Sequence, residues 1–78
     1  MATHADQTLD CSGMACPMPI LKTKKAVDAL TLGQVLKMVA TDPGSVSDMT
    51  AWTNKTGHEL VATERDGDKY VFYVKKAK

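Results

Sequence analysis

Two prolines separated by one residue, Pro17 and Pro19, restrict where the first helix of this chain can begin. Proline presets φ near the helical value and lacks the N–H group that the first turn of a helix leaves unpaired. Pro17 also keeps the preceding residue, Cys16, out of the α region and in an extended conformation. The two prolines therefore predict a helix that begins at Pro19, with Cys16 held just outside its N-terminus.

The residues after Pro19 have helical periodicity. Four of them recur at the spacing of one helical face: Ile20, Thr23, Val27 and Leu30. Gly33 follows at a position where helices commonly stop. We therefore expect the first helix over residues 19–30.

Four other segments have the character of strands. Residues 8–11 form a short candidate strand, and residues 34–40 are apolar on both faces, which is typical of a central strand. Residues 58–65 and 69–76 are separated by a segment with Asp66-Gly67, and Asp-Gly is a strong hairpin signal. The last two strands are thus expected to pair with each other.

A second helix is expected between the second and third strands. Ser45 has the chemistry of an N-cap, Asp48 stands in the first turn, and Gly57 is placed to end the helix. Three residues share the apolar face of this helix: Val46, Met49 and Thr53.

The order β-α-β-α-β-β predicts an α+β fold, a two-layer sandwich with both helices on one face of a mixed four-stranded sheet. A chain of 78 residues leaves no room for a second domain. We expect residues 1–7 to form a flexible tail and residues 8–78 to form the single domain.

Composition narrows the class of protein. A formal net charge of +1 is too small to indicate a polyanion partner, so we expect no direct binding of nucleic acid. No run of eighteen apolar residues occurs, and the polar N-terminus has no apolar signal segment, so we expect no membrane association. Two cysteines are too few for a secreted disulfide scaffold, which favours free thiols in the cytoplasm.

The position of Cys16 predicts a moderately activated thiol. An ordinary cysteine has a pKa of about 8.5, and a helix N-terminus lowers it by a few tenths to about one unit. A cysteine hydrolase also needs a base beside the thiol, usually histidine. His4 is in the tail and His58 begins the third strand, so neither is adjacent in sequence. This chemistry favours a group that receives and passes on an atom.

The segment "LDCSGMACPMPIL" resembles the signature D-x-x-G-x-x-C-P-x-P of the TusA/SirA family of small sulfur carrier proteins. The residues that match the signature are Asp10, Gly13, Cys16, Pro17 and Pro19. The resemblance continues through "TDPGSVSDMTAW" and "GHELVATERDGDKYVFYVKK", so it covers nearly the whole chain after the tail.

The resemblance implies that Cys16 carries sulfur as a persulfide, without a cofactor and as a carrier rather than a self-sufficient enzyme. A cysteine desulfurase or a rhodanese would load it. An acceptor protein would take the sulfur for tRNA thiolation, molybdenum cofactor supply or sulfur oxidation. Gly13, Pro17 and Pro19 would shape the loop that presents Cys16, and Asp10 would order it. A monomer suits such a shuttle.

Two positions near the motif leave alternatives open. Ala15 stands where some family members carry a basic residue, and Cys11 is not part of the signature. Cys11 is interpreted either as a small apolar residue at a strand end or as a redox partner of Cys16 in a thiol/disulfide regulator. No metal site is expected, because two cysteines and two remote histidines make a poor zinc ligand set.

Five further residues are candidates for partner docking. Met14 and Met18 bracket Cys16 and offer either an adaptable apolar rim or packing against the first helix. Lys22, Lys24 and Lys25 lie off the apolar face of that helix and form either a solvated surface or a dock for acidic partners.

Overall fold

The computed structural model of the chain describes residues 5–14 and 18–78. Its six elements are β1 (Gln7–Cys11), α1 (Met18–Asp28), β2 (Val35–Ala40), α2 (Ser45–Thr56), β3 (Glu59–Asp66) and β4 (Lys69–Lys75). Their order, β-α-β-α-β-β, is the order predicted from the sequence.

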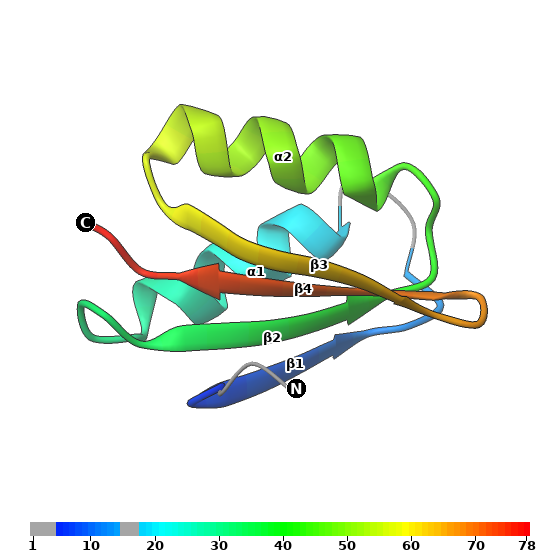
Figure 1. Ribbon diagram of the computed structural model, residues 1–78, viewed down its shortest axis with the longest axis horizontal. Coiled ribbons are helices and arrows are strands. Elements are labelled where there is room, and N and C mark those ends of the chain that lie inside the picture. Colours follow the sequence, from blue (N-terminus) through cyan, green and yellow to red (C-terminus); the bar gives the residue numbers. More distant parts are fainter. Residues whose placement is uncertain (1–4, 15–17) are drawn as a thin grey trace.

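The four strands form one mixed sheet in the order β1-β2-β4-β3. β1 and β2 run parallel and are joined through α1, whereas β4 is antiparallel to both β2 and β3. Figure 1 shows α1 behind the strands and α2 beside β3. Val27 of α1 and Met49 of α2 pack in one cluster with the sheet, so both helices cover the same face, and no helix among the described residues covers the other. The predicted α+β sandwich is confirmed. No helix in the described part of the chain is long and apolar enough to cross a bilayer.

The core lies between the sheet and the two helices. Alternate residues of β2 and β4 point into it, as the two-residue period of a strand requires. The residues that contribute most from the sheet are Leu36, Met38, Phe72 and Val74, all at most 1% exposed. β2 and β4 are the two inner strands, which confirms the prediction that residues 34–40 form a central strand.

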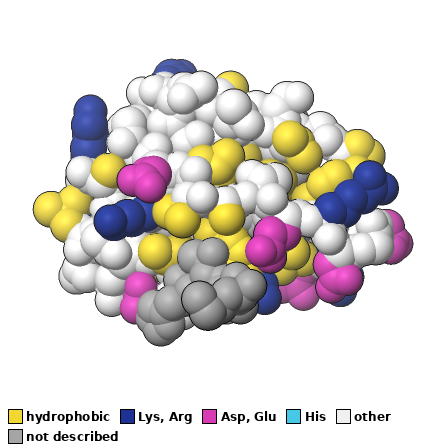
Figure 2. Space-filling view, in the orientation of Figure 1, with side chains coloured by type: hydrophobic (Ala, Val, Ile, Leu, Met, Phe, Trp, Pro, Cys, Tyr) yellow, Lys and Arg dark blue, Asp and Glu magenta, His cyan; other side chains and the backbone are white. Residues whose placement is uncertain are grey.

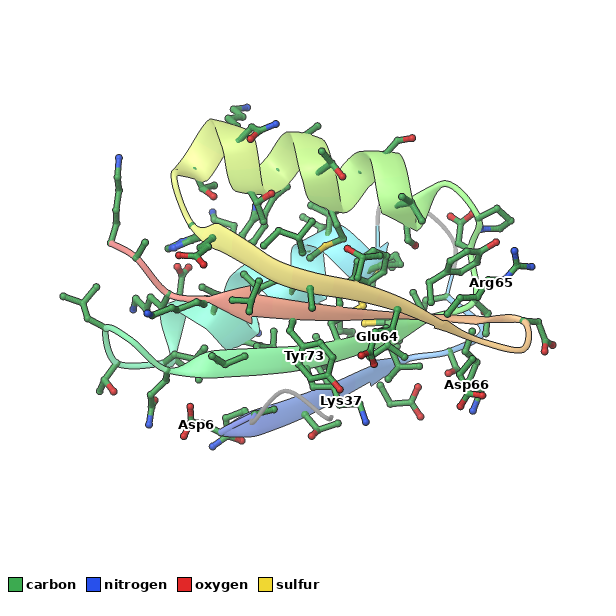
Figure 3. All side chains as sticks on the ribbon, in the orientation of Figure 1. Asp6, Lys37, Glu64, Arg65, Asp66 and Tyr73 are labelled. Carbon is green, nitrogen blue, oxygen red and sulfur yellow. The ribbon has the colours of Figure 1, made fainter. Side chains whose placement is uncertain are left out.

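The uncovered face of the sheet carries a mixture of apolar and charged side chains. Figure 2 shows hydrophobic side chains gathered over the middle of this face, with acidic and basic groups around them. Lys37, Glu64 and Tyr73 project from it (Figure 3). Tyr73 is only 3% exposed.

α1 begins at Met18, one residue before the predicted start. Pro19 is buried in the first turn, and the Thr23 hydroxyl donates a hydrogen bond of 2.7 Å to its carbonyl oxygen. This bond satisfies the one polar atom that Thr23 brings to the apolar face. The helix ends at Asp28 rather than Leu30, although Leu30 is only 5% exposed and still packs in the core.

The predicted N-cap of α2 is wrong. Gly44 occupies the cap position without a side-chain cap, and Ser45 is the first helical residue. The Asp42 carboxylate accepts the Gly44 N–H at 3.0 Å, and the Asp42 carbonyl accepts the Ser45 N–H at 3.0 Å. Asp42 therefore forms the turn into the helix, and Ser45 is pushed inward, where its Oγ is buried without a hydrogen-bond partner in the described structure.

The rest of α2 follows the prediction with one exception. Met49 and Thr53 are buried as expected, but Val46 is 38% exposed. Gly57 ends the helix at a φ of +84°, and its N–H donates to the Thr53 carbonyl at 2.9 Å.

The β3–β4 hairpin has a two-residue loop, because Asp66 pairs with Lys69. Gly67 has a φ of +62°, and among the described residues only glycines have positive φ, so Asp68 does not. A positive φ at the first of the two loop positions, and not at the second, is typical of a type II′ turn with glycine at that first position. The predicted hairpin is confirmed, with Gly67-Asp68 rather than Asp66-Gly67 at its tip.

The segment predicted as a tail, residues 1–7, overlaps the start of the sheet. β1 begins at Gln7, one residue earlier than expected. The Asp6 N–H donates to the Val35 carbonyl at 2.8 Å, and the Asp6 carboxylate accepts the Val35 N–H at 2.9 Å. Asp6 therefore extends the pairing of β1 with β2 into the segment assigned to the tail.

Candidate functional site

The candidate site is the segment that joins β1 to α1, at the carboxyl end of β1. Cys16 and Pro17, together with Ala15, lie outside the described residues, so the site is built here from its two flanks. The first flank is the loop from Asp10 to Met14, and the second is the first turn of α1 from Met18. Ligand sites of open α/β sheets commonly lie at the carboxyl ends of parallel strands.

The first flank is a closed turn. The Met14 N–H donates to the Cys11 carbonyl at 3.1 Å, and Gly13 has a φ of +80° at the third position of the turn. This φ is typical of a type II turn, which strongly favours glycine there. The chain thus reverses direction immediately after β1.

Asp10 holds the start of this turn. Its carboxylate accepts the Ser12 N–H at 2.9 Å. The side chain of Ser12 and then this N–H lower the pKa of Asp10. Of the two groups, the N–H makes the clear hydrogen bond, because the buried Ser12 Oγ has no partner within hydrogen-bonding geometry in the described structure. The Asp10 carboxylate is therefore charged at neutral pH and supports the turn.

The lowered pKa of Asp10 predicts a contribution to stability that depends on pH. Because the folded pKa lies below the ordinary value of about 3.9, the contribution is complete above roughly pH 5 and is lost as the pH falls through the folded pKa. Asp10→Asn keeps an oxygen for the Ser12 N–H but has no charge to titrate. We expect its unfolding free energy to fall less steeply than that of the wild type below pH 4, measured by urea denaturation. Equal slopes in the two proteins would contradict this role.

Thr41 is a contact that the sequence reasoning missed. The Gly13 N–H donates to Thr41 Oγ1 at 2.9 Å, across 28 positions of sequence. Cys11 pairs with Ala40 in the parallel ladder, so Thr41 follows β2 directly beside the turn that follows β1. The available signal was the parallel pairing of the first two strands, which brings their carboxyl ends together.

Thr41→Val tests this contact. Valine has the shape of threonine but cannot accept the Gly13 N–H, so we expect a loss of about 0.5–1.5 kcal/mol in unfolding free energy. The amide hydrogen of Gly13 should also exchange faster with solvent, as measured by NMR. Thr63→Val, at an exposed position of β3, is the matched control and should change neither quantity by a comparable amount. Unchanged exchange at Gly13 would show that Thr41 does not restrain the loop.

Cys11 is part of the core. Its side chain is fully buried and packs in the same cluster as Val27, Leu36 and Met38. Burial raises the pKa of the Cys11 thiol, the charge of Asp10 adds to the rise, and the charge of Lys22 partly offsets it. A buried thiol with a raised pKa is a poor nucleophile. The structure therefore favours the interpretation of Cys11 as a small apolar residue at a strand end.

His58 is not brought to the site. It precedes β3, whose first residue pairs with Lys75, and Lys75 pairs in turn with Val35 at the start of β2. The loop follows Cys11, which pairs with Ala40 at the end of β2. The two ends of β2 are about 17 Å apart at 3.3 Å per residue. His58 Nδ1 accepts the Ala77 N–H at 3.2 Å, and its ring lies 5.5 Å from that of Trp52. His58 thus stabilises the other end of the sheet; His4 lies outside the described residues.

The candidate docking residues divide into two groups. Met14 is half-buried and packs against the core. Met18, in contrast, is 43% exposed and lines a shallow depression of about 210 Å³ with Leu21, Lys22 and Lys25. Lys24 is also exposed. An apolar patch edged by lysines therefore covers the first turns of α1.

Comparisons with known proteins identify relatives of this chain. A family model described as "Sulfurtransferase TusA" matches residues 7–76. The chain is 50% identical over 72 residues to the "Sulfur carrier protein TusA" of Allochromatium vinosum, which covers 92% of this chain and 95% of that one. It is 46% identical over 72 residues to the "Putative sulfur carrier protein YrkI" of Bacillus subtilis, at 92% and 96% coverage.

A solved structure shows the same fold. The SirA-like protein from Desulfitobacterium hafniense superposes with a TM-score of 0.78, covering 92% of this chain and 99% of that one at 20% identity. The fold, the family model and the identity to curated relatives lead to one conclusion: the chain belongs to the TusA family.

Proposed function

We propose that this protein is a sulfur carrier that accepts sulfane sulfur as a persulfide on Cys16 and passes it to an acceptor protein. One observation carries the proposal: of the two cysteines in the chain, Cys11 is fully buried with a raised pKa. Cys16 is therefore the cysteine that we propose to carry the sulfur. The relatives named sulfur carrier proteins support the same role.

The proposed transfer needs no redox partner. The Cys16 thiolate attacks the outer sulfur of a persulfide on the donor. A sulfur–sulfur bond forms at Cys16, the corresponding bond in the donor breaks, and the donor cysteine leaves as a thiolate that takes up a proton. In the second step a thiolate of the acceptor attacks the outer sulfur on Cys16, and Cys16 leaves as a thiolate that takes up a proton. The donor would be a cysteine desulfurase or a rhodanese.

The surroundings of the site suit a carrier better than a hydrolase. A hydrolase needs a base oriented beside its thiol. His58 lies at the other end of the sheet from Met14 and Met18 and already accepts the Ala77 N–H. Among the described residues, the histidine is therefore not placed to act as that base, which favours a carrier that holds its cargo until a partner arrives.

The apolar and basic patch on α1 is the proposed contact for partners. Met18 and Leu21 offer apolar surface, and Lys22 and Lys25 complement acidic side chains. The pathway served would be tRNA thiolation, molybdenum cofactor supply or sulfur oxidation, with the protein acting as a cytoplasmic monomer. The alternative, a regulator with a reversible Cys11–Cys16 disulfide, is less favoured because Cys11 is packed in the core.

Mass spectrometry tests the proposal. The protein is incubated with a sulfane-sulfur donor and a rhodanese, and its intact mass is then measured without reductant. We expect the added mass of one sulfur atom, located on the peptide that contains Cys16. A wild-type protein that stays unmodified, or that takes up sulfur on Cys11, would overturn the assignment.

A further inference from the structure

The outer edge of β1 has unpaired main-chain groups. β1 ends the sheet order, and no strand pairs with its outer side among residues 5–14 and 18–78. The Lys76 N–H donates to the Gln34 carbonyl, so by alternation Leu36 and Met38 direct their main-chain groups toward β4, and the residues between them direct theirs toward β1. Gln7 and Leu9 lie opposite Leu36 and Met38 in the parallel register, so they bond with the groups of β2 that face β1. Thr8 and Asp10 direct their main-chain groups outward. A strand placed beside β1 would find these donors and acceptors ready to pair.

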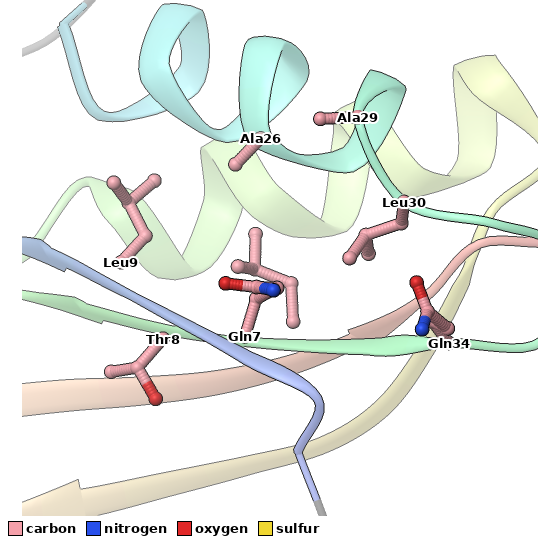
Figure 4. A pocket seen from close by; sticks show the side chains of 8 residues that line it. Gln7, Thr8, Leu9, Ala26, Ala29, Leu30 and Gln34 are labelled. Carbon is pink, nitrogen blue, oxygen red and sulfur yellow. The ribbon is translucent and has the colours of Figure 1, made fainter.

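An apolar groove runs beside this edge, between β1 and α1. It has a volume of about 280 Å³ and is lined by Gln7, Thr8, Leu9, Ala26, Ala29, Leu30, Gln34 and Leu36. Figure 4 shows Leu9 and Leu30 around it, with Gln7 reaching in from the strand. Thr8 lines the groove although its side chain points to the other face of the sheet (Figure 4), so the groove reaches the main chain of β1. We call this feature the β1 groove.

The size and shape of the β1 groove suit inserted side chains. Pockets for small molecules usually have volumes of about 300–1,000 Å³ and enclose most of the ligand. The β1 groove is smaller, open along a strand edge and mainly apolar. Pairing of an extended segment with a free edge uses the main chain for affinity and pockets for alternate side chains for specificity. The β1 groove offers both.

Charge indicates which segment would fit. Asp10 lies on the face of β1 opposite to Leu9, and it is exposed. A basic side chain on the added strand would lie across from it, and opposite charges on neighbouring strands stabilise a sheet. A second copy of this chain fits less well, because its own Leu9 is packed in its core and its Asp10 repeats the same charge.

We propose that the edge of β1 and the β1 groove bind an extended segment of a partner protein in which apolar and basic side chains alternate. The apolar side chains enter the groove between Leu9, Ala26 and Leu30, and the basic ones lie on the face of Asp10. β1 leads into the turn of residues 11–14, so the bound segment lies beside the chain that continues to Cys16. That this partner is a sulfur donor or acceptor rests on the proposed function.

NMR titration with a short peptide of alternating lysine and valine tests the binding. We expect shifts of the Thr8 and Asp10 amide signals and at least tenfold slower hydrogen exchange at both when the peptide is bound. A peptide with glutamate in place of lysine should bind at least about fivefold more weakly. Shifts at Thr8 and Asp10 that depend on protein concentration without any peptide would show that a second copy occupies the edge, which overturns the proposal.

Two alanine substitutions separate groove filling from a general effect of added bulk. Ala29→Leu places a larger side chain at an exposed position of the β1 groove and should weaken peptide binding at least tenfold. Ala51→Leu makes the same change at an exposed position of α2 and should leave binding unchanged. Equal binding by both variants, or unchanged amide signals of Thr8 and Asp10 with the lysine peptide, would overturn the proposal.

The outcome for docking is separate from the outcome for sulfur chemistry. Peptide binding is measured on protein without sulfur and does not require Cys16, whereas sulfur loading is measured by mass. Loading without peptide binding would overturn only the docking site, and peptide binding without loading would overturn only the carrier function.

Discussion

Cys16→Ser is expected to abolish sulfur loading, leaving the intact mass unchanged after incubation with a sulfane-sulfur donor. Serine has nearly the shape of cysteine, so the substitution removes the sulfur atom and little else. A hydroxyl at neutral pH is not ionised and cannot form the sulfur–sulfur bond on which the proposed transfer depends. The loss should therefore be complete, in contrast to the partial losses that follow from changes in the surrounding loop.

The matched control is Cys11→Ala, which removes the other cysteine of the chain. Alanine is preferable to serine here because a hydroxyl at this fully buried position would need a hydrogen-bond partner. Cys11→Ala should be less stable because it leaves a small cavity, yet it should load one sulfur atom as the wild type does. Loading of Cys16→Ser, or loss of loading in folded Cys11→Ala, would contradict the assignment of roles to the two cysteines.

Local patterns were sufficient to predict the six elements of the fold. The periodicity of residues 19–30, the apolar run of residues 34–40 and the Asp66-Gly67 turn each depend on neighbours in sequence. The N-cap of α2 was wrong because two side chains compete for that turn. Asp42 accepts the Gly44 N–H and sets the path of the chain, which moves Ser45 into the helix.

The site was predictable only as far as its sequence motif extends. Asp10 and Gly13 were identified from the resemblance to the family signature, and the turn of residues 11–14 gives both a physical role. Thr41 and the β1 groove were not predicted. Each depends on which strands are neighbours, and the order β1-β2-β4-β3 follows from packing of the whole sheet rather than from any one segment.

The second large effect concerns the core. Phe72 is the largest fully buried side chain, and it lies on inner strand β4 between Met38 of β2 and Thr63 of β3. Phe72→Ala should cost about 3–5 kcal/mol, from lost apolar burial and the cavity that remains. A chain of this size has a total unfolding free energy of about 4–12 kcal/mol. The substitution therefore removes a large share of the stability, and we expect the midpoint of thermal unfolding to fall by at least about 12 °C.

Val61→Ala is the control for this prediction, because Val61 is 39% exposed on the edge strand β3 and leaves no enclosed cavity when truncated. It should lower the midpoint by no more than a few degrees. A shift for Phe72→Ala as small as that of Val61→Ala would mean that the two layers do not pack through β4. Below its midpoint, Phe72→Ala should still load sulfur, because its cavity lies inside the core while the proposed chemistry needs only Cys16 and a reachable donor. Loss of loading in the folded variant would instead show that the core controls the loop.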